Sequence, residues 1–397
     1  AQLLVLAKAA YYISNSRYGD AVNLLDRNEN MPAAGGFSAY MKAYSLLKQG
    51  DVRGVKEVYE RFRTANPRNP IRHEIALLYA EALFQAGDAG SAADVCLGVA
   101  SGAEDAYTKL HAYDELTKIY SKDMDAGKIS EAFSRAAADP DVAALKELGF
   151  MMSDRLGTMT VPEKYSIRIA SFFESQDRYY DAYNALGRSP LPPADPQAAL
   201  LNGIALSRMG RAIEALQNFD AASAQAAASE TKRSACVWRG RTYLSSTSAA
   251  DIKKGESILK GCVMNYKSGS GEAIQQLVRL YDIRENEAAA TGLLDILYAY
   301  DAGYDEALLE RYARTKLSAG KRAAALAAFE TMTDIFPKGK YADEALFWTA
   351  KLKLAAGRRD EALELLTKLR KSFPYSYYFF KAGELIDKTG GDAVASK

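Results

Sequence analysis

The sequence predicts an all-α fold, a solenoid of stacked helical hairpins, and three observations support this prediction. A short phrase recurs along the 397 residues: a small residue, a glycine seven positions later and another small residue five positions after that, as in Ala350, Gly357 and Ala362. Apolar residues follow helical spacing, and the period-two alternation of strands is absent over any useful length. A composition of 48% hydrophobic and 25% charged residues is that of a folded protein. Because one hairpin cannot bury its own apolar face, such repeats stack on one another.

The clearest phrases have a fixed spacing. Gly357 follows Gly320 by 37 residues, and Gly87 follows Gly50 by the same distance. Small residues precede five of the turn glycines by seven positions, namely Ala43, Ala80, Gly203, Ala313 and Ala350. This pattern resembles the tetratricopeptide repeat, in which helix A, a tight turn, helix B and a terminating proline follow one another. At roughly 35–37 residues per pair, we expect about ten or eleven pairs.

Other phrases are degenerate. Asp177 and Glu285 stand at the turn position in the phrases that begin at Ala170 and Val278, and the phrase from Ala9 lacks the glycine. The hairpin that contains Gly240 has an insertion at 245–248. Residues 101–160 show helical apolar spacing without a clean phrase.

The domain organisation is predicted from proline. The segment 189–196 holds four prolines, Pro190, Pro192, Pro193 and Pro196, and an extended chain is expected there. We therefore expect N-terminal helical repeats over 1–188 and C-terminal helical repeats over 189–397, in one continuous superhelix with a bend at 189–196.

Composition excludes several classes of function. Lys and Arg number 51 against 50 Asp and Glu, a balance that argues against a nucleic-acid partner. No run of 18 apolar residues occurs, so no transmembrane segment is expected, and no leader is recognised at Ala1. No phosphate-binding loop is present, and two histidines and three cysteines are too few for most metal sites, so neither a cofactor nor a metal is expected. We expect His73 at a helix start or surface, His111 packed at a helix interface and Cys96 in the core.

Two cysteines are predicted to be neighbours. Cys236 lies on the first helix of the Gly240 hairpin and Cys262 on the second, and both face the core of that pair if the insertion loops out. In an oxidising compartment they can form a disulfide, which needs a Cα separation below about 7 Å; otherwise they are buried thiols. Cys96 is left unpaired.

The C-terminal phrases have a second resemblance. The run from Phe336 to Trp348, with Pro337, Tyr341 and Ala345, leads through Gly357 to a Phe-Pro-Tyr-Ser-Tyr-Tyr segment at 373–378. Over about 320–388 this resembles the helical superstructure of soluble lytic murein transglycosylases. That resemblance implies a periplasmic α-superhelix with a lysozyme-like catalytic domain at its C-terminal end. The phrase is also similar to that of periplasmic tetratricopeptide adaptors and lipoproteins.

No active site is expected within this chain. Glu174-Ser175 and Ala182-Tyr183-Asn184 are similar to catalytic-domain motifs of that family, but they lie only a few residues apart and in ordinary repeat positions. The leading hypothesis is a non-catalytic scaffold of a lytic transglycosylase-like envelope protein in the periplasm, which positions a catalytic module after residue 397 and engages peptidoglycan or a protein. The alternative is a stand-alone adaptor that binds a peptide or protein in its concave groove.

An aromatic cluster is the candidate binding site. Five rings fall within seven residues, namely Tyr375, Tyr377, Tyr378, Phe379 and Phe380. Because exposed apolar patches mark interaction sites, we predict that part of this cluster is exposed and docks a following domain or a partner.

Overall fold

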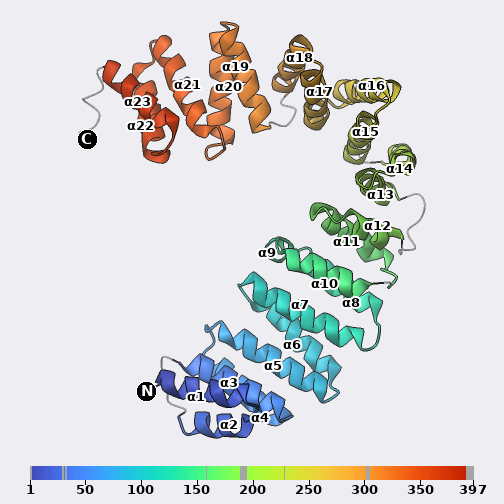
Figure 1. Ribbon diagram of the computed structural model, residues 1–397, viewed down its shortest axis with the longest axis vertical. Helices are drawn as coiled ribbons and strands as arrows, with labels where there is room; N and C mark the ends of the chain where they lie inside the picture. Colours follow the sequence, from blue (N-terminus) through green and yellow to red (C-terminus); the bar gives the residue numbers. More distant parts are fainter. Residues whose placement is uncertain are drawn as a thin grey trace. The chain divides into compact units, whose positions relative to one another are not determined.

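The computed structural model describes residues 2–28, 31, 34–157, 159–187, 195–227, 229–300 and 305–389, and every regular element in them is helical (Figure 1). The predicted all-α class is confirmed. Contacts divide the chain into two compact units, Ala1–Asn218 and Phe219–Lys397, with the boundary inside α14 (Ala212–Gln225). Most of the predicted bend at 189–196 lies outside the described residues, so a division there stays a prediction.

The N-terminal unit consists of helical hairpins and one inserted pair of helices. The hairpins are α1 (Gln2–Ser14) with α2 (Tyr18–Asp26), α3 (Gly35–Lys48) with α4 (Val52–Ala65), α5 (Ile71–Gln85) with α6 (Ala89–Gly102), α7 (Ala106–Ser121) with α8 (Ala126–Ala136), α11 (Glu163–Ser175) with α12 (Tyr179–Gly187), and α13 (Pro196–Arg208) with the start of α14. The inserted helices are α9 (Pro140–Ala143) and α10 (Lys146–Leu156).

The C-terminal unit continues with the same type of hairpin. It contains the end of α14, then α15 (Ser229–Leu244) with α16 (Ala249–Tyr266), α17 (Gly271–Ile283) with α18 (Glu287–Ala299), α19 (Glu306–Ser318) with α20 (Arg322–Ile335), α21 (Ala342–Ala355) with α22 (Arg359–Ser372), and finally α23 (Tyr377–Lys388). A short 3₁₀ turn, Lys267–Gly269, precedes α17.

The two helices of each hairpin cross at small or slender side chains. In most hairpins the crossing residues lie twelve positions apart, as Ala350 and Ala362 do, and both of these are fully buried. The other pairs at this spacing are Ala9/Ala21, Ala43/Val55, Ala80/Ala92, Thr117/Ile129, Ala170/Ala182, Gly203/Ala215, Val278/Ala290 and Ala313/Ala325. The predicted repeat frame is therefore the frame in which the helices pack.

In every described hairpin except α15–α16, the turn residue has a left-handed backbone, which turns the chain sharply between the two helices. It follows the first crossing residue by seven positions, and its φ ranges from 53° at Met124 to 89° at Gly87. Glycine adopts this conformation without steric cost. The predictions for Asp177 and Glu285 are confirmed, because both have positive φ. Ser16, in the phrase from Ala9, and Met124 occupy the same position; neither was named as a turn residue, because neither side chain favours a left-handed backbone.

An aspartate or asparagine directly after several turn residues starts the second helix. Asp51 Oδ1 accepts a hydrogen bond from the Gly54 N–H at 2.9 Å, and Asp88 Oδ1 accepts one from the Ser91 N–H at 3.0 Å. Each carboxylate satisfies a backbone donor that has no partner within the helix. The turn and the cap together fix where one helix ends and the next begins.

Residues 101–160, which lack a clean phrase, form a hairpin in the same frame. Thr117 and Ile129 take the positions that small residues occupy elsewhere, and both are fully buried. The Thr117 hydroxyl donates to the Asp114 carbonyl in its own helix at 3.0 Å. The inserted α9 and α10 then lengthen the spacing before the next hairpin, so the periodicity is lost in the sequence.

The α15–α16 hairpin crosses at two glycines. The 245–248 insertion places Gly255, rather than a residue twelve positions on, opposite Gly240. A Cβ on Gly240 would lie 2.5 Å from Leu259 Cγ, and a Cβ on Gly255 would lie 2.8 Å from the Gly240 carbonyl oxygen. No larger residue fits at this crossing without movement of the backbone.

Cys236 and Cys262 form a disulfide across the same hairpin, with their Cα atoms 6.1 Å apart. Both cysteines face the core of the pair, as predicted. Cys96 is a free, buried thiol in the core of the N-terminal unit.

Successive hairpins are also joined by polar contacts. Glu306, in the first turn of α19, accepts hydrogen bonds from the backbone N–H groups of Lys340 at 3.0 Å and Tyr341 at 2.8 Å. A Cβ on Gly339 would overlap the Glu306 carboxylate, at 2.1 Å from Oε1. The Pro-Lys-Gly-Lys-Tyr turn thus fits against the preceding hairpin because it contains a glycine.

Candidate interaction surfaces

The predicted docking segment forms the α22–α23 turn and the start of α23. Ser376 caps the helix, because its Oγ accepts a hydrogen bond from the Phe379 N–H at 3.2 Å. Tyr375 is 98% exposed, Tyr377 67% and Phe380 65%. These three rings therefore lie on the surface of the C-terminal unit.

The other two rings turn inward. Tyr378 packs against Phe347 with the rings tilted and their centroids 5.2 Å apart, and Phe379 packs beneath the Arg370 guanidinium at 4.8 Å. Both join the core cluster around Ala382, which is fully buried. The segment is thus part anchor and part exposed surface, and its role in docking stays a prediction.

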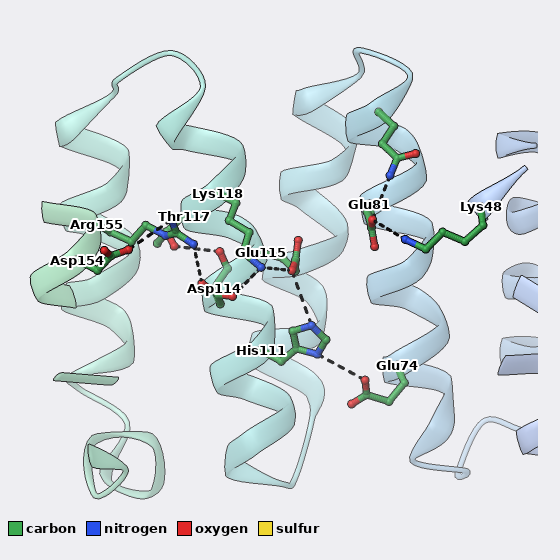
Figure 2. A network of polar contacts seen from close by, with 11 residues as sticks. Lys48, Glu74, Glu81, His111, Asp114, Glu115, Thr117, Lys118, Asp154 and Arg155 are labelled. Carbon is green, nitrogen blue, oxygen red and sulfur yellow. Dashed lines mark hydrogen bonds and ion pairs between the residues drawn. The ribbon is translucent and has the colours of Figure 1, made fainter. Parts of the chain in front are cut away.

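A second surface runs along the first helices of the N-terminal hairpins (Figure 2). We call it the charged strip; its members are Lys48, Glu74, Glu81, His111, Asp114, Glu115, Lys118 and Arg155. It crosses from α3 through α5 and α7 to α10. The strip therefore spans several hairpins instead of lying within one.

His111 lies between two carboxylates of the strip. Its Nδ1 is 3.5 Å from Glu74 Oε2 on α5, and its Nε2 is 3.8 Å from Glu115 Oε1 on α7. The hydrogen bond to Glu74 raises the pKa of His111, and the same bond holds the pKa of Glu74 below its usual range. His111 is at a helix interface, as predicted, but its side chain is 49% exposed and its acidic partners were not anticipated.

Lys118 connects the His111 contacts to the α10 end of the strip. Its Nζ lies 2.7 Å from Asp114 Oδ2 and 2.6 Å from Glu115 Oε1. Asp114 in turn pairs with Arg155 of the inserted α10 at 3.3 Å. At the other end, Lys48 lies 3.8 Å from Glu81. Charges of both signs alternate along the surface.

The strip residues recur at fixed positions in the repeat. Glu74 and His111 precede the first crossing residue of their hairpins by six positions, and Glu81 and Lys118 follow it by one. The sequence contains this signal, but it is visible only once the repeat containing Thr117 is aligned with the others.

In the C-terminal unit, a charged residue at one of these two positions pairs with a charged residue at the other. Arg314, one position after Ala313, pairs with Glu344 of α21, with nitrogen-to-oxygen distances of 2.7 and 2.8 Å. It also pairs with Glu310 of its own helix, whose pKa is raised by burial. Glu344 is only 5% exposed, so its carboxylate is more shielded from solvent than the carboxylates of the N-terminal strip.

His73 lies in a cleft on another face of the N-terminal unit. The cleft, of about 480 Å³, is lined by α4, the start of α5 and α6, including Arg63, Arg72 and Asp94. His73 Nε2 accepts a hydrogen bond from Arg72 Nε at 3.2 Å, and burial and Arg72 lower the pKa of the imidazole. The residue lies at a helix start, as predicted, is half-buried, and also hydrogen-bonds the backbone of Gly102, the last residue of α6.

The remaining candidate residues have structural positions. Burial raises the pKa of the Cys96 thiol to about 12, which leaves it protonated and unreactive. Ala182, in the segment similar to a catalytic motif, is a buried crossing residue. Within the described ranges, no group of three or more His, Cys, Asp or Glu side chains is placed to hold a metal ion. No helix in the described part of the chain is long and apolar enough to cross a membrane.

Comparison with known proteins agrees with this geometry at the C-terminal end. Residues 344–376, which cover most of α21 and α22, match a family model described as tetratricopeptide repeat. No curated protein matches the chain.

Three solved structures are similar to the chain at low identity. Yeast Tom70 is 12% identical with a TM-score of 0.38, over 100% of this chain and 97% of that chain. The human IFIT1 dimer with PPP-AAAA is 13% identical with a TM-score of 0.40, over 95% of each chain. The APC/C hetero-tetramer Cut9-Hcn1 is 10% identical with a TM-score of 0.30, over 96% of this chain and 89% of that chain. At these TM-scores the likenesses carry no inference about function.

The family match and the hairpin frame agree on the fold. The chain is a tetratricopeptide-like solenoid, a type of scaffold suited to protein interactions.

Proposed function

We propose that the chain is a protein-binding scaffold that works in an oxidising compartment, the periplasm or cell envelope, and binds its partner on the charged strip. The observation that carries the proposal is the recurrence of charge at matching positions of successive first helices. Glu74, His111 and Glu344 share one position, and Glu81, Lys118 and Arg314 share another.

The stability of the fold does not require this pattern of charges. Exposed ion pairs contribute only about 0–1 kcal/mol each, and the hydrophobic crossings already fix the helices. An exposed row of both signs instead selects a partner of complementary charge and speeds the encounter. An extended peptide or a helix face with alternating charges has the chemistry to match it.

The compartment is proposed from the disulfide. Disulfides persist in oxidising compartments and are rare where glutathione and thioredoxin keep thiols reduced. If protein from the native host is trapped with an alkylating reagent under denaturing, non-reducing conditions, mass spectrometry should show label on Cys96 alone. Label on Cys236 and Cys262 as well would contradict an oxidising location.

Crosslinking tests the binding surface. A photoreactive amino acid in place of Glu81 or Lys118 should crosslink a protein in the native host. The matched control is Arg53, 90% exposed on the second helix α4. Equal crosslinking at Arg53 would show that the strip has no special role.

A finer proposal is that the scaffold belongs to a lytic transglycosylase-like protein of the cell envelope. Its support is the resemblance over about 320–388, including the Phe-Pro-Tyr-Ser-Tyr-Tyr segment. The gene should then continue in frame after Lys397 with Glu-Ser, Gly-Leu-Met-Gln and Ala-Tyr-Asn motifs at wide spacing, and the protein should sediment with purified peptidoglycan. A stop codon there would favour the stand-alone adaptor.

A further inference from the structure

The exposed aromatic residues at the turn before α23 stand where the turn before α21 has charged residues. Counterparts 37 residues apart are Lys338 and Tyr375, Lys340 and Tyr377, and Asp343 and Phe380. Lys338 and Lys340 are exposed although α22 and α23 stack after their turn. A further hairpin stacked on α23 in the same way would therefore leave Tyr375 and Tyr377 exposed. A partner that covers these rings must therefore bind at the edge of the stack, where the turns between hairpins lie, and not at its end, where a further hairpin would stack.

The rings project from this edge. Tyr375 is 98% exposed, so almost none of its surface rests on the protein. Tyr377 and Phe380 lie three residues apart on one face of α23, and Ser376 fixes the start of that helix. Rings that protrude from a rigid helix can insert into a deformable medium, such as a lipid bilayer, without a partner that has a matching pocket.

The surroundings of the rings are basic. Residues 368–388 contain five Lys or Arg and two Asp or Glu, whereas the whole chain has a net charge of only +1. Lys371 is exposed just before the rings. Lys381 follows them, with Nζ 5.9 Å from the Tyr377 ring and 3.1 Å from Glu384.

We propose that this aromatic turn, Tyr375, Tyr377 and Phe380 with Lys371 and Lys381, binds the surface of a bilayer that contains anionic lipid. Tyrosine side chains favour the headgroup level of a membrane, and phenylalanine inserts its ring on the apolar side of that level. Each lysine near an anionic surface contributes about 1 kcal/mol of attraction. Binding to such a surface increases with the apolar area buried and with the electrostatic attraction to anionic lipid, and this turn supplies both. The proposal goes beyond the scaffold function, because it concerns where the array is held, and each can fail without the other.

Vesicle flotation with the full, disulfide-intact chain tests the proposal. The protein should float with vesicles of phosphatidylcholine that contain about a third phosphatidylglycerol, and much less with phosphatidylcholine alone. Binding should weaken as salt is raised. No flotation with the anionic vesicles, or equal flotation with both kinds, would overturn the proposal.

Variants locate the contact. Combined Tyr375→Ser, Tyr377→Ser and Phe380→Ser should lower vesicle partitioning at least about tenfold, since three exposed rings are lost. Combined Lys371→Gln and Lys381→Gln should remove most of the preference for anionic vesicles. The matched control is Tyr11→Ser, Tyr107→Ser and Tyr180→Ser, three exposed tyrosines on other hairpins. Retained binding in the aromatic variant, or equal loss in the control, would overturn the assignment.

Two further measurements keep the result decisive. Circular dichroism melts should show that the variants remain folded, since all these side chains are exposed. Poly-glutamate serves as a soluble acidic probe. Binding to poly-glutamate without binding to vesicles would identify an acidic protein as the occupant and overturn the lipid proposal.

Discussion

Gly255 lies against the backbone of Gly240, so that a Cβ on Gly255 would sit 2.8 Å from the Gly240 carbonyl oxygen. This is the closest kind of crossing a helical hairpin can make, because neither side has a side chain. The 245–248 insertion lengthens the spacing between the two crossing residues from twelve to fifteen positions, which moves the contact point along α16 and brings a second glycine to it. The disulfide between Cys236 and Cys262 joins the same two helices.

Gly255→Ala should lower the free energy of unfolding of the C-terminal unit by about 1–3 kcal/mol, because the methyl group must push the helices apart. Gly261→Ala is the matched control on α16, since a Cβ there meets nothing within 4 Å. The control should be neutral or stabilising by up to about 1 kcal/mol, from helix propensity alone. Urea melts of both variants provide the comparison, and equal effects would contradict the close crossing.

Ala362→Leu should destabilise the last hairpin by about 1–3 kcal/mol, because Ala362 is fully buried where α21 and α22 cross. Ala355→Leu places the same side chain on an exposed position of α21 and should change stability by less than about 0.5 kcal/mol. A neutral result for Ala362→Leu in denaturant unfolding would mean that the repeat frame is misassigned.

Glu285→Gly should raise stability by about 0.5–1 kcal/mol, since Glu285 has φ 55° at a turn where other hairpins have glycine. The reverse change, Gly320→Ala at φ 72°, should lower stability by about 1 kcal/mol. Thermal melts should move in opposite directions. Shifts of the same sign would show that backbone conformation does not decide these turns.

The two histidines should titrate on opposite sides of the ordinary value of 6.5. In an NMR titration the pKa of His111 should be higher because of Glu74, and the pKa of His73 lower because of burial and Arg72. Glu74→Gln should bring the pKa of His111 down towards 6.5, and it should lower the pKa of His73 further, because the Glu74 charge also acts on that ring. Identical titration of both rings would contradict the described contacts.

The contact between His111 and Glu74 also makes the stability of the fold depend on pH. A raised pKa makes protonated His111 stabilising below pH 6.5, and this contribution is lost as pH rises through the folded pKa. A lowered pKa makes ionised Glu74 stabilising above pH 4.5, and its contribution is lost as pH falls through the folded pKa. The pair is therefore most favourable between these values. Since both groups are partly exposed, His111→Gln should lower the free energy of unfolding by only about 0.5 kcal/mol between these pH values and should leave it unchanged near pH 9. Urea melts at one pH in that range and at pH 9 provide the comparison.

Much of the fold is predictable from sequence because glycine and alanine are needed where backbones meet. The phrases around Gly357 and Gly50 identify both the crossing and the turn of their hairpins, and Asp177 and Glu285 keep the frame without glycine. The hairpin with Thr117 and Ile129 was missed, since slender side chains satisfy the crossing there and Met124 accepts the turn conformation.

The surfaces were harder to predict. Exposed positions are constrained by charge pairing and not by packing, so the strip appears only when Glu74 and His111 are seen at one position of adjacent hairpins. Cys236 and Cys262 could be placed on facing helices, but spacing alone could not decide their bond. In the aromatic segment, local sequence could not distinguish Tyr378, which packs on Phe347, from Tyr377, which is exposed.

The Cys236–Cys262 bond also has a mechanical consequence. A stack of hairpins that is pulled from its ends unfolds one hairpin at a time, and each unfolded hairpin adds its contour length to the extension of the chain. The bond joins residues 26 positions apart, so about 90 Å of contour stays hidden under tension. The oxidised chain therefore extends less than the reduced one at the same force, and the α15–α16 hairpin remains closed as a loop after its neighbours have been drawn out.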